Sequence, residues 1–409
     1  MSKLQDLIKE LCPDGVEFMR MDEVFEMRNG YTPSKANDKY WDNGTIPWFR
    51  MEDIRQNGRI LSDSIQHITK EAVKGGRLFP ANSFIIATTA TIGEHALVIA
   101  DSLANQRFTN LTIRKSLVEQ ILVKYLFYYL FVVGEWCKNN TNISGFASVD
   151  MSKFKKLEIP IPPLEVQNEI VRILDTFTSH AAELQAELQA RKEQYEYYRN
   201  KLLTFDENDE GVKWMKLGEI GNFVRGNGLQ KKDFTETGVG CIHYGQIYTY
   251  YGTSTDTTKS FVSYDLAQKL TKVKSGNLVI ACTSENIEDV CKAVVWLGEE
   301  DIVTGGHACV FAHNEIPKYI AYFFQTEYFF QQKKKYARGA KVIDIKVSDL
   351  EKISIPIPPL SEQQRIVSIL DKFESFVNDL TAGLPAEIAA VQEQYEYYRN
   401  KLLTFKRIS

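Results

Sequence analysis

The sequence predicts an α+β protein in which two globular domains are separated by a pair of long antiparallel coiled-coil helices, with the halves related by a pseudo-twofold repeat. Three observations support this fold class. A proline-rich segment followed by a heptad seam occurs twice in the 409-residue chain. Each copy follows a block of mixed strand and helix composition. The two blocks share little sequence outside their flanks, so one frame is expected to carry two different domains.

The proline-rich segment defines the repeat. Residues 159–177 read IPIPPLEVQNEIVRILDTF and residues 355–373 read IPIPPLSEQQRIVSILDKF, an offset of 196. The segment QYEYYRNKLLTF begins at Gln194 and again at Gln394, an offset of 200. The second copy has therefore gained four residues, about one helical turn.

Each repeated segment predicts a long helix. Apolar residues recur over residues 170–205 at alternating steps of four and three, the spacing of a coiled-coil seam. The second copy repeats this seam over residues 366–405, except that the step from Leu384 to Ile388 is a second consecutive step of four. Because Gly383 and Pro385 flank that step, we expect a kink or a break there.

We expect the two helices to pair in antiparallel fashion within one chain, because a compact block returns the chain between them. A coiled coil that joins two copies of the protein is the alternative. The first helix also contains AAEL followed by QAEL at residues 181–188. Each such tetrapeptide adds about 6 Å of helix, which predicts an adjustable spacer.

The two blocks are expected to be α+β domains. Runs such as SFIIATTATIG and NLVIACTSENI have strand composition, whereas ILVKYLFYYLF and YIAYFFQTEYFF are typical of buried helices. The chain is therefore divided into a first domain at 1–158, a spacer helix at 159–205, a second domain at 206–354 and a second spacer helix at 355–409.

The composition excludes a membrane protein and a disulfide scaffold. The chain is 44% hydrophobic and 25% charged, with a net charge of −4. Its most apolar stretch, residues 121–133, is too short to span a bilayer. The first twelve residues lack the apolar core of a secretory signal, so a cytoplasmic location is expected. The six scattered cysteines are expected to be reduced core thiols.

The sequence offers no catalytic or metal-binding motif. It has no GxxxxGK[ST] phosphate loop, no GxGxxG after a strand and no HExxH. The IPIPPL motif lacks the Asn or Asp that an amino-methyltransferase places before Pro-Pro-aromatic. We therefore expect no catalytic residue and no metal ligand. A nuclease or methyltransferase whose site gathers distant residues is one alternative, and an oligomeric scaffold is another.

Both blocks contain polar, loop-like stretches of the residue types that contact base edges and phosphates. Residues 331–341, QQKKKYARGAK, carry five positive charges and no acidic residue, which is typical of a phosphate-contacting loop or of a solvated charge run. The candidate DNA-contacting residues are Thr32, Ser34, Lys35, Asn105, Gln106, Arg107, Gln230, Lys231, Lys232, Tyr244, Gln246, Lys333, Lys334, Lys335, Arg338 and Lys341.

Charge is the main objection to nucleic-acid binding. Residues 1–158 carry 20 basic and 19 acidic side chains, and residues 206–354 carry 18 and 20. Neither block is a basic domain. DNA contact must then be confined to local patches or depend on another subunit, and the isolated chain should bind weakly.

Taken together, these features resemble the DNA-specificity subunit of type I restriction–modification systems. Two variable blocks are each followed by IPIPPLxxQ, ILDxF and QYEYYRNKLLTF segments. The first block opens with GYTPS at residues 30–34, followed by Tyr40-Trp41 and by GTIPW at residues 44–48. This combination is characteristic of the family's target-recognition domains.

The resemblance implies that residues 1–158 and 206–354 are target-recognition domains, each reading one half of a bipartite, asymmetric sequence in double-stranded DNA. It implies assembly with two methyltransferase and two restriction subunits. S-adenosylmethionine, ATP and Mg²⁺ would bind to those partners, with no cofactor in this chain. The family's conserved helices dock the partners, and the candidates here, which could instead be core residues, are Tyr195, Tyr197, Tyr198, Tyr395, Tyr397 and Tyr398.

Overall fold

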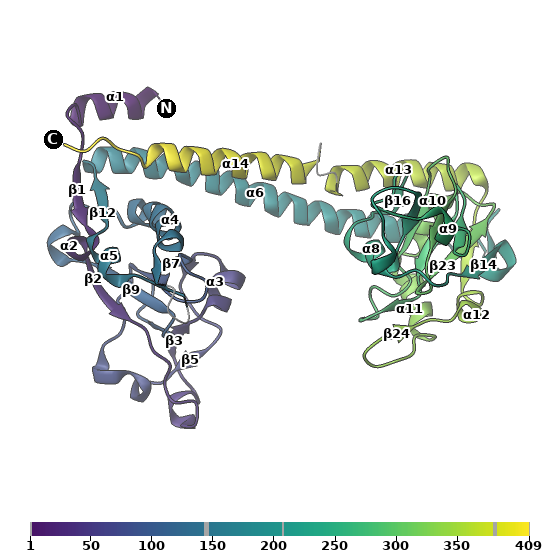
Figure 1. The fold of residues 1–409 in the computed structure, drawn as a ribbon, viewed down its shortest axis with the longest axis horizontal. Helices are drawn as coiled ribbons and strands as arrows, with labels where there is room; N and C mark the ends of the chain where they lie inside the picture. Colours follow the sequence, from purple (N-terminus) through teal and green to yellow (C-terminus); the bar gives the residue numbers. More distant parts are fainter. Residues whose placement is uncertain (1, 143–146, 207, 379–382, 409) are drawn as a thin grey trace. The chain divides into compact units, whose positions relative to one another are not determined.

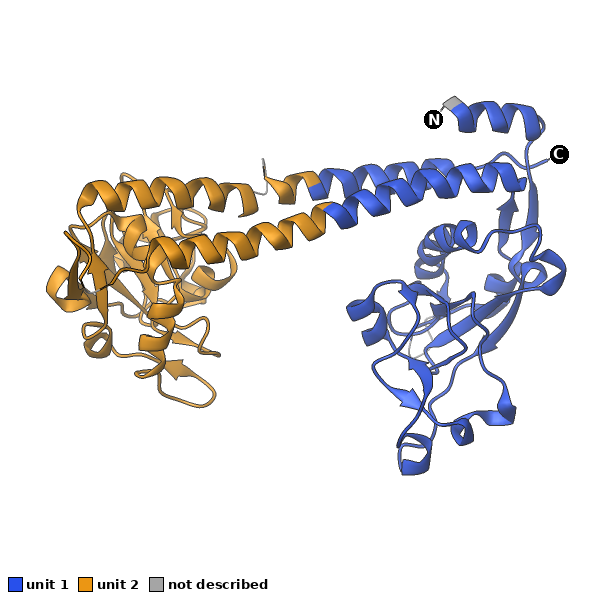
Figure 2. Ribbon diagram, turned by 180° about the vertical axis from the view of Figure 1, so that it is seen from behind, with its two compact units in different colours: residues 1–183, 388–409 blue, residues 184–387 orange. Residues whose placement is uncertain are grey.

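The computed structural model describes residues 2–142, 147–206, 208–378 and 383–408. The chain divides into two compact units, coloured separately in Figure 2. Unit 1 comprises Met1–Glu183 with Ile388–Ser409, and unit 2 comprises Leu184–Glu387. Each unit therefore combines one variable block with parts of both repeated helical segments.

Unit 1 contains a five-stranded sheet of order β2-β9-β6-β7-β4 and a three-stranded sheet of order β5-β3-β8. Its elements before the long helix are α1 (Ser2–Leu11), β1 (Glu17–Arg20), α2 (Met21–Val24), β2 (Phe25–Asn29), β3 (Ile46–Phe49), α3 (Met51–Asn57), β4 (Ile60–Leu61), β5 (His67–Ile68), β6 (Ser83–Ala87), β7 (His95–Val98), β8 (Leu103–Ala104), β9 (Phe108–Ile113), α4 (Val123–Asn139), β10 (Thr141–Asn142), β11 (Ser148–Val149), α5 (Met151–Lys156) and β12 (Glu158–Ile161).

Unit 2 contains a five-stranded sheet of order β14-β23-β19-β21-β16 and a four-stranded sheet of order β17-β15-β22-β18. Its elements between the long helices are β13 (Lys213–Lys216), α7 (Leu217–Ile220), β14 (Gly221–Arg225), β15 (Val239–Ile242), α8 (Tyr244–Thr249), β16 (Ser254–Thr255), β17 (Ser260–Val262), α9 (Tyr264–Ala267), β18 (Thr271–Val273), β19 (Leu278–Ala281), β20 (Thr283–Ser284), β21 (Ala293–Trp296), β22 (Ile302–Thr304), β23 (Ala308–His313), α10 (Pro317–Phe323), α11 (Glu327–Lys334), β24 (Ile343–Asp344), α12 (Val347–Leu350) and β25 (Ser354–Ile357).

The two variable blocks share one topology despite their different sequences. The five-stranded sheets correspond strand for strand, and in each the last strand joins in parallel, β4 to β7 and β16 to β21. The backbone contacts also repeat. Gly30 N donates to Phe108 O at 2.9 Å, and Gly226 N donates to Ala308 O at the same distance. The frame is therefore duplicated, and the loops differ.

The repeated segments form the long helices α6 (Leu164–Leu202), α13 (Leu360–Asn378) and α14 (Leu384–Leu402), seen in Figure 1. α6 is one continuous helix of 39 residues, about 58 Å long, and it belongs to both units. The second copy forms two helices, so the predicted interruption is confirmed. Leu380, which we placed in its seam, lies outside the described residues.

The helices pair in antiparallel fashion within each unit, as predicted. In unit 1, Phe177 of α6 stacks on Tyr398 of α14 with ring centroids 5.4 Å apart. The tail after α14 then pairs Arg407 with Glu158, just before α6 begins. In unit 2, Tyr198 stacks on Phe373 at 5.6 Å, and Arg191 lies over Phe376, so the two helices run in opposite directions.

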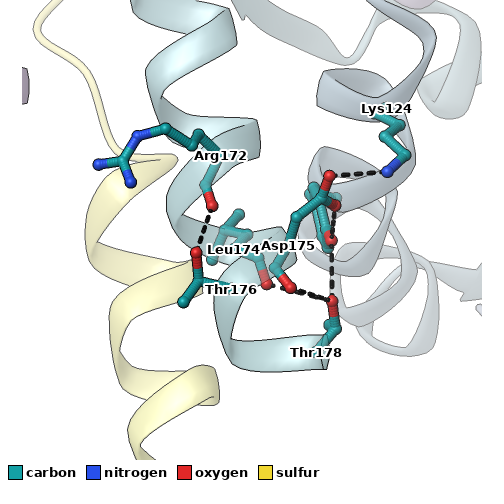
Figure 3. Close-up of polar contacts among 7 residues, drawn as sticks. Lys124, Arg172, Leu174, Asp175, Thr176 and Thr178 are labelled. Atoms are coloured by element: carbon teal, nitrogen blue, oxygen red, sulfur yellow. Dashed lines mark hydrogen bonds and ion pairs between the residues drawn. The ribbon is translucent and has the colours of Figure 1, made fainter. Parts of the chain in front are cut away.

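The aspartate of each ILDxF motif attaches a globular block to a helix. Asp175 accepts a hydrogen bond from Lys124 at 2.7 Å (Figure 3) and another from Tyr128 at 2.6 Å, and both donors are on α4. In unit 2, Asp371 accepts equivalent bonds at 3.0 Å from Lys318 and at 2.6 Å from the hydroxyl of Tyr322, on α10. The same contact is therefore built twice.

The glutamine of each IPIPPLxxQ motif fixes the start of its helix. Gln167 is buried; its Oε1 accepts from Leu122 N at 2.8 Å and its Nε2 donates to Pro162 O at 2.7 Å. Gln363 repeats this arrangement with Ile316 N at 3.0 Å and Pro358 O at 2.9 Å. These bonds satisfy buried backbone groups where the chain enters the helix.

The core predictions are confirmed. All six cysteines are free and buried. The two apolar stretches form buried helices, although the second forms two, α10 and α11, because Thr326 caps α11 by accepting from Phe329 N. In the part of the chain that the structure describes, no helix is both long and apolar enough to cross a bilayer.

Candidate functional site

The loop after Gly30 and the loop at residues 105–107, both predicted to contact DNA, meet on one surface of unit 1, which we call the edge of this unit. A Cβ on Gly30 would lie 2.3 Å from the carbonyl oxygens of Ala104 and Asn105, so only glycine permits this approach. The loop after Gly30 thus lies against residues 105–107. Thr32 Oγ1 donates to Gln106 Oε1 at 2.5 Å, which joins the two sets of candidate residues.

Aromatic residues of the first block hold this edge in place. Trp48 Nε1 donates to Tyr31 O and Trp41 Nε1 donates to Ser34 O, each at 3.0 Å. The two indole rings pack edge to face at 5.1 Å. These are the residues of the GYTPS, Tyr-Trp and GTIPW motifs, so those motifs support the loop.

The side chains that remain available at this edge are polar or positively charged. Ser34, Lys35, Gln106 and Arg107 are exposed. Asn105 has a more structural role, because its Oδ1 accepts from Arg107 N at 3.0 Å and so shapes the turn. The edge therefore presents hydrogen-bonding groups of the kind that read base edges.

The equivalent edge of unit 2 carries the second set of candidate residues. The loop after Gly226 occupies the place of the loop after Gly30, and it exposes Gln230, Lys231 and Lys232. Tyr244 is half-buried between His243 and His307, with ring centroids 4.5 and 4.8 Å away. A Cβ on Gly306 would lie 3.7 Å from Gly226 O and Asn227 Cα, so the loop after Gly226 begins beside His307.

His307 also belongs to this edge, although it is not among the candidate DNA-contacting residues. It directly precedes β23 as Arg107 directly precedes β9, so the two residues occupy equivalent positions. His307 is exposed, and its Nδ1 lies 3.0 Å from Thr283 Oγ1. The offset of 200 residues between the two QYEYYRN copies would have aligned His307 with Arg107. Residues 305–307 (Gly-Gly-His) and 105–107 (Asn-Gln-Arg) share no residue, however, so sequence identity does not reveal the match.

Gln246 is a capping residue in this structure. Its Oε1 accepts from His243 N at 3.1 Å, and its Nε2 donates to Ser260 Oγ at 2.6 Å. Both ends of the amide are therefore engaged at the start of α8, and the side chain holds the helix that carries Tyr244.

The basic window at 331–341 is only partly a loop, and the prediction for Lys333 is wrong. The window begins inside α11, where Lys333 lies four residues after buried Phe329 on the same face. Lys333 is 4% exposed, and its Nζ donates to Val290 O at 2.6 Å and Glu288 O at 2.9 Å. Burial lowers the pKa of this ammonium.

The other cations of the window are on the surface. Lys334, Lys335, Arg338 and Lys341 are exposed. Arg338 pairs with Asp349 at 3.4 Å, which leaves Lys334, Lys335 and Lys341 as the exposed cations of this window without an ion pair among the described residues.

The six tyrosines of the QYEYYRN segments divide by position. Tyr195 and Tyr395 are 6% and 7% exposed, so their assignment to partner docking is wrong; they fill the core at the helix junctions. Tyr198 and Tyr398 form the stacking contacts described above. Tyr197 and Tyr397 are 60% and 58% exposed. Lys201 and Lys401 lie over their rings, so one surface feature appears in both units.

Buried histidines have structural roles. His95 hydrogen-bonds to Phe127 O at 3.2 Å, and burial lowers its pKa to about 3. Burial also lowers the pKa of His313 to about 4. Among the described residues, no group of three or more His, Cys, Asp or Glu side chains could hold a metal ion.

Comparison with known proteins identifies the family. The family model described as the type I restriction modification DNA specificity domain matches residues 13–193 and 209–390. The chain belongs to this family. Each match of this specificity domain covers one variable block with the helical segment that follows it, in agreement with the internal repeat.

Relatives that are similar over most of the chain support this assignment. The type I restriction enzyme EcoprrI specificity subunit of Escherichia coli is 39% identical over 395 residues, 93% of each chain. The Escherichia coli EcoR124I/EcoR124II specificity subunit is 33% identical over 70% of this chain and 72% of its own. The chain is thus a type I restriction–modification specificity subunit, a protein that functions in DNA sequence recognition.

A solved structure supports the fold of this specificity subunit. It is described as the structural basis of complex assembly and conformational transition of the type I R-M system. It matches with a TM-score of 0.66 at 17% identity and covers 96% of this chain and 98% of that one. The α+β fold with two domains linked by helices is therefore confirmed.

Proposed function

We propose that this specificity subunit reads a bipartite, asymmetric site in double-stranded DNA, one half with each unit, and directs methyltransferase and restriction subunits to it. The observation that carries the proposal is the duplicated frame with two different edges. Thr32, Gln106 and Arg107 lie at one edge, and Lys231, Tyr244 and His307 lie at the equivalent one. Two units with the same fold but different side chains at their edges are suited to two half-sites of different sequence.

α6 is proposed to set the gap between the half-sites, because it is a continuous helix common to both units. Its AAEL-QAEL segment, residues 181–188, lies where the helix passes from unit 1 to unit 2. A change in its length alters the spacer and leaves both edges as they are.

The chemistry is proposed to belong to partner subunits. Two methyltransferase subunits would bring S-adenosylmethionine, and two restriction subunits would bring ATP and Mg²⁺, with the complex acting in the cytoplasm. Tyr197, Tyr198, Tyr397 and Tyr398 are the docking candidates that remain. Tyr197 and Tyr397 are the most exposed of them, and their equivalent positions suit two copies of one partner. The specificity subunit itself would be non-catalytic.

Methylome sequencing tests this function. Deletion of the gene from a host that carries the whole system should abolish adenine methylation at one bipartite motif. Restoration of the gene should bring back that motif. Persistence of the motif after deletion would contradict the proposal. Methyl transfer by the purified chain alone, given DNA and S-adenosylmethionine, would show instead that it is an enzyme.

A further inference from the structure

Three cations that are not among the candidate DNA-contacting residues gather beside the loop that follows Gly30. Arg28 lies on β2, and Lys74 and Arg77 flank the glycine pair of the segment KGGR. A surface cavity of about 310 Å³ opens between them. Its lining consists of Arg28, Asn29, Tyr31, Lys74, Gly75, Arg77 and Leu103.

The cluster is held in shape by its neighbours. The Arg28 guanidinium lies 5.0 Å from the centroid of the Phe79 ring, and its Nη2 donates to Arg77 O at 2.9 Å. Tyr31 fixes the other side: its hydroxyl accepts from Lys74 N at 2.7 Å and donates to Ala72 O at 3.0 Å. Lys74 Nζ lies 4.7 Å from the Tyr31 ring centroid.

The charges of the cluster are not neutralised. Whereas Arg59 pairs with Glu94 at 2.5 Å elsewhere in the unit, no ion pair among the described residues involves Arg28, Lys74 or Arg77. Partial burial and the nearby Arg77 also lower the pKa of Arg28, as expected where like charges are held together. An anion that enters this cavity displaces no carboxylate.

The backbone beside these cations is open to a ligand. Gly75 and Gly76 both have a φ of +65°, a conformation that favours glycine. A Cβ at either position would meet nothing within 4 Å, so this turn faces open space. A phosphate group can therefore approach the Lys74 and Arg77 side chains without steric obstruction.

Unit 2 lacks this feature at the equivalent strand position. The β2–β9 and β14–β23 registers place Val224 where unit 1 has Arg28. Val224 is 53% exposed and uncharged. The Arg28 position of the cluster is thus not part of the shared frame.

We propose that Arg28, Lys74 and Arg77 of unit 1 form a binding site for the DNA phosphate backbone. This inference rests on the proposed function. Guanidinium groups match phosphate oxygens in a bidentate geometry, and phosphate contacts fix the register of a reading edge without carrying sequence information. The cluster adjoins the Tyr31–Lys35 loop, so a phosphate held there positions the duplex against Thr32, Gln106 and Arg107.

The test uses the variant Lys74→Gln/Arg77→Gln, because both side chains are exposed and Arg28 keeps its packing on Phe79. Affinity of the complex with its methyltransferase partners is measured on cognate and non-cognate duplexes over a range of salt concentrations. We expect weaker binding to both duplexes by a similar factor. The slope of log affinity against log salt concentration is negative, and its magnitude should decrease by about 1 to 2.

The matched control is Lys155→Gln/Lys156→Gln on α5, which removes the same charge from exposed positions of unit 1. It should leave the salt slope at the wild-type value. A wild-type slope in the Lys74/Arg77 variant would overturn the phosphate site, and so would a change in the bases preferred. If the wild-type complex showed no bipartite preference, the proposed function would fail instead, which separates the two outcomes.

Discussion

At the scale of single residues, the two edges differ in the groups they offer to DNA. Arg107 and His307 occupy equivalent positions before β9 and β23. Arginine pairs in bidentate fashion with guanine O6 and N7, whereas a histidine held by Thr283 presents one ring nitrogen. Equivalent residues of different chemistry are expected to select different bases in the two half-sites.

Replacement of His307 by arginine should change the preferred base at one position of one half-site. The expected change in preference is roughly tenfold, toward guanine, with the other half-site unchanged. Methylome sequencing measures it. His180→Arg, at an exposed position on α6, is the control and should leave the motif as it is. An unchanged motif in the His307 variant would remove this residue from the reading edge.

The buried His95 predicts a dependence of stability on pH. Its folded-state pKa of about 3 lies below the value of about 6.5 expected in the unfolded chain. Below pH 6.5 the unfolded state therefore binds more protons, and the free energy of unfolding falls as the pH drops toward 3. The loss should reach about 2 kcal/mol at pH 5.

Thermal unfolding between pH 7 and pH 5 measures this loss, before most carboxylates titrate. His95→Gln should show a weaker pH dependence than the wild type, and His180→Gln should show the wild-type dependence. Equal slopes in all three proteins would mean that His95 is not held neutral by burial.

At the scale of helices and strands, the near-constant segments perform one structural task twice. Asp175 and Asp371 each accept from a lysine and a tyrosine of the neighbouring helix. Asp175→Asn and Asp371→Asn should each reduce stability by about 1 kcal/mol, because a charge-assisted contact at a partly exposed site is weakened. Chemical denaturation of the two variants measures this, and a loss in only one would show that the two junctions are not equivalent.

The helical repeat could be predicted from the sequence because its seam and its Gly-Leu-Pro interruption depend on local spacing. The position of Lys333 could not. Its neighbours have the composition of a charge run, and only the packing of the α11 face that carries Phe329 and Lys333 buries the ammonium. His307 was missed for a related reason: strand register, and not sequence identity, shows that its position in unit 2 is equivalent to that of Arg107 in unit 1. The Arg28 cluster joins residues 46 positions apart, which no local pattern reveals.

On the proposed function, the length of α6 should set the gap between the two half-sites. An added AAEL unit lengthens the helix by about 6 Å, and DNA rises 3.4 Å per base pair. With a tilted helix, we expect the gap to widen by about one base pair while both half-sites keep their bases. Methylome sequencing of the insertion variant reports both quantities. Altered half-site bases would contradict the spacer role of this helix.

At the scale of the whole molecule, the central claim is that each unit reads its half-site independently of the other. The shared topology of the two blocks and their unlike edges both lead to this claim. The direct measurement replaces residues 206–354 with the corresponding block of a relative that has a different motif, followed by methylome sequencing. The account predicts a hybrid motif in which only one half-site changes. A change in both half-sites, or in neither, would contradict it.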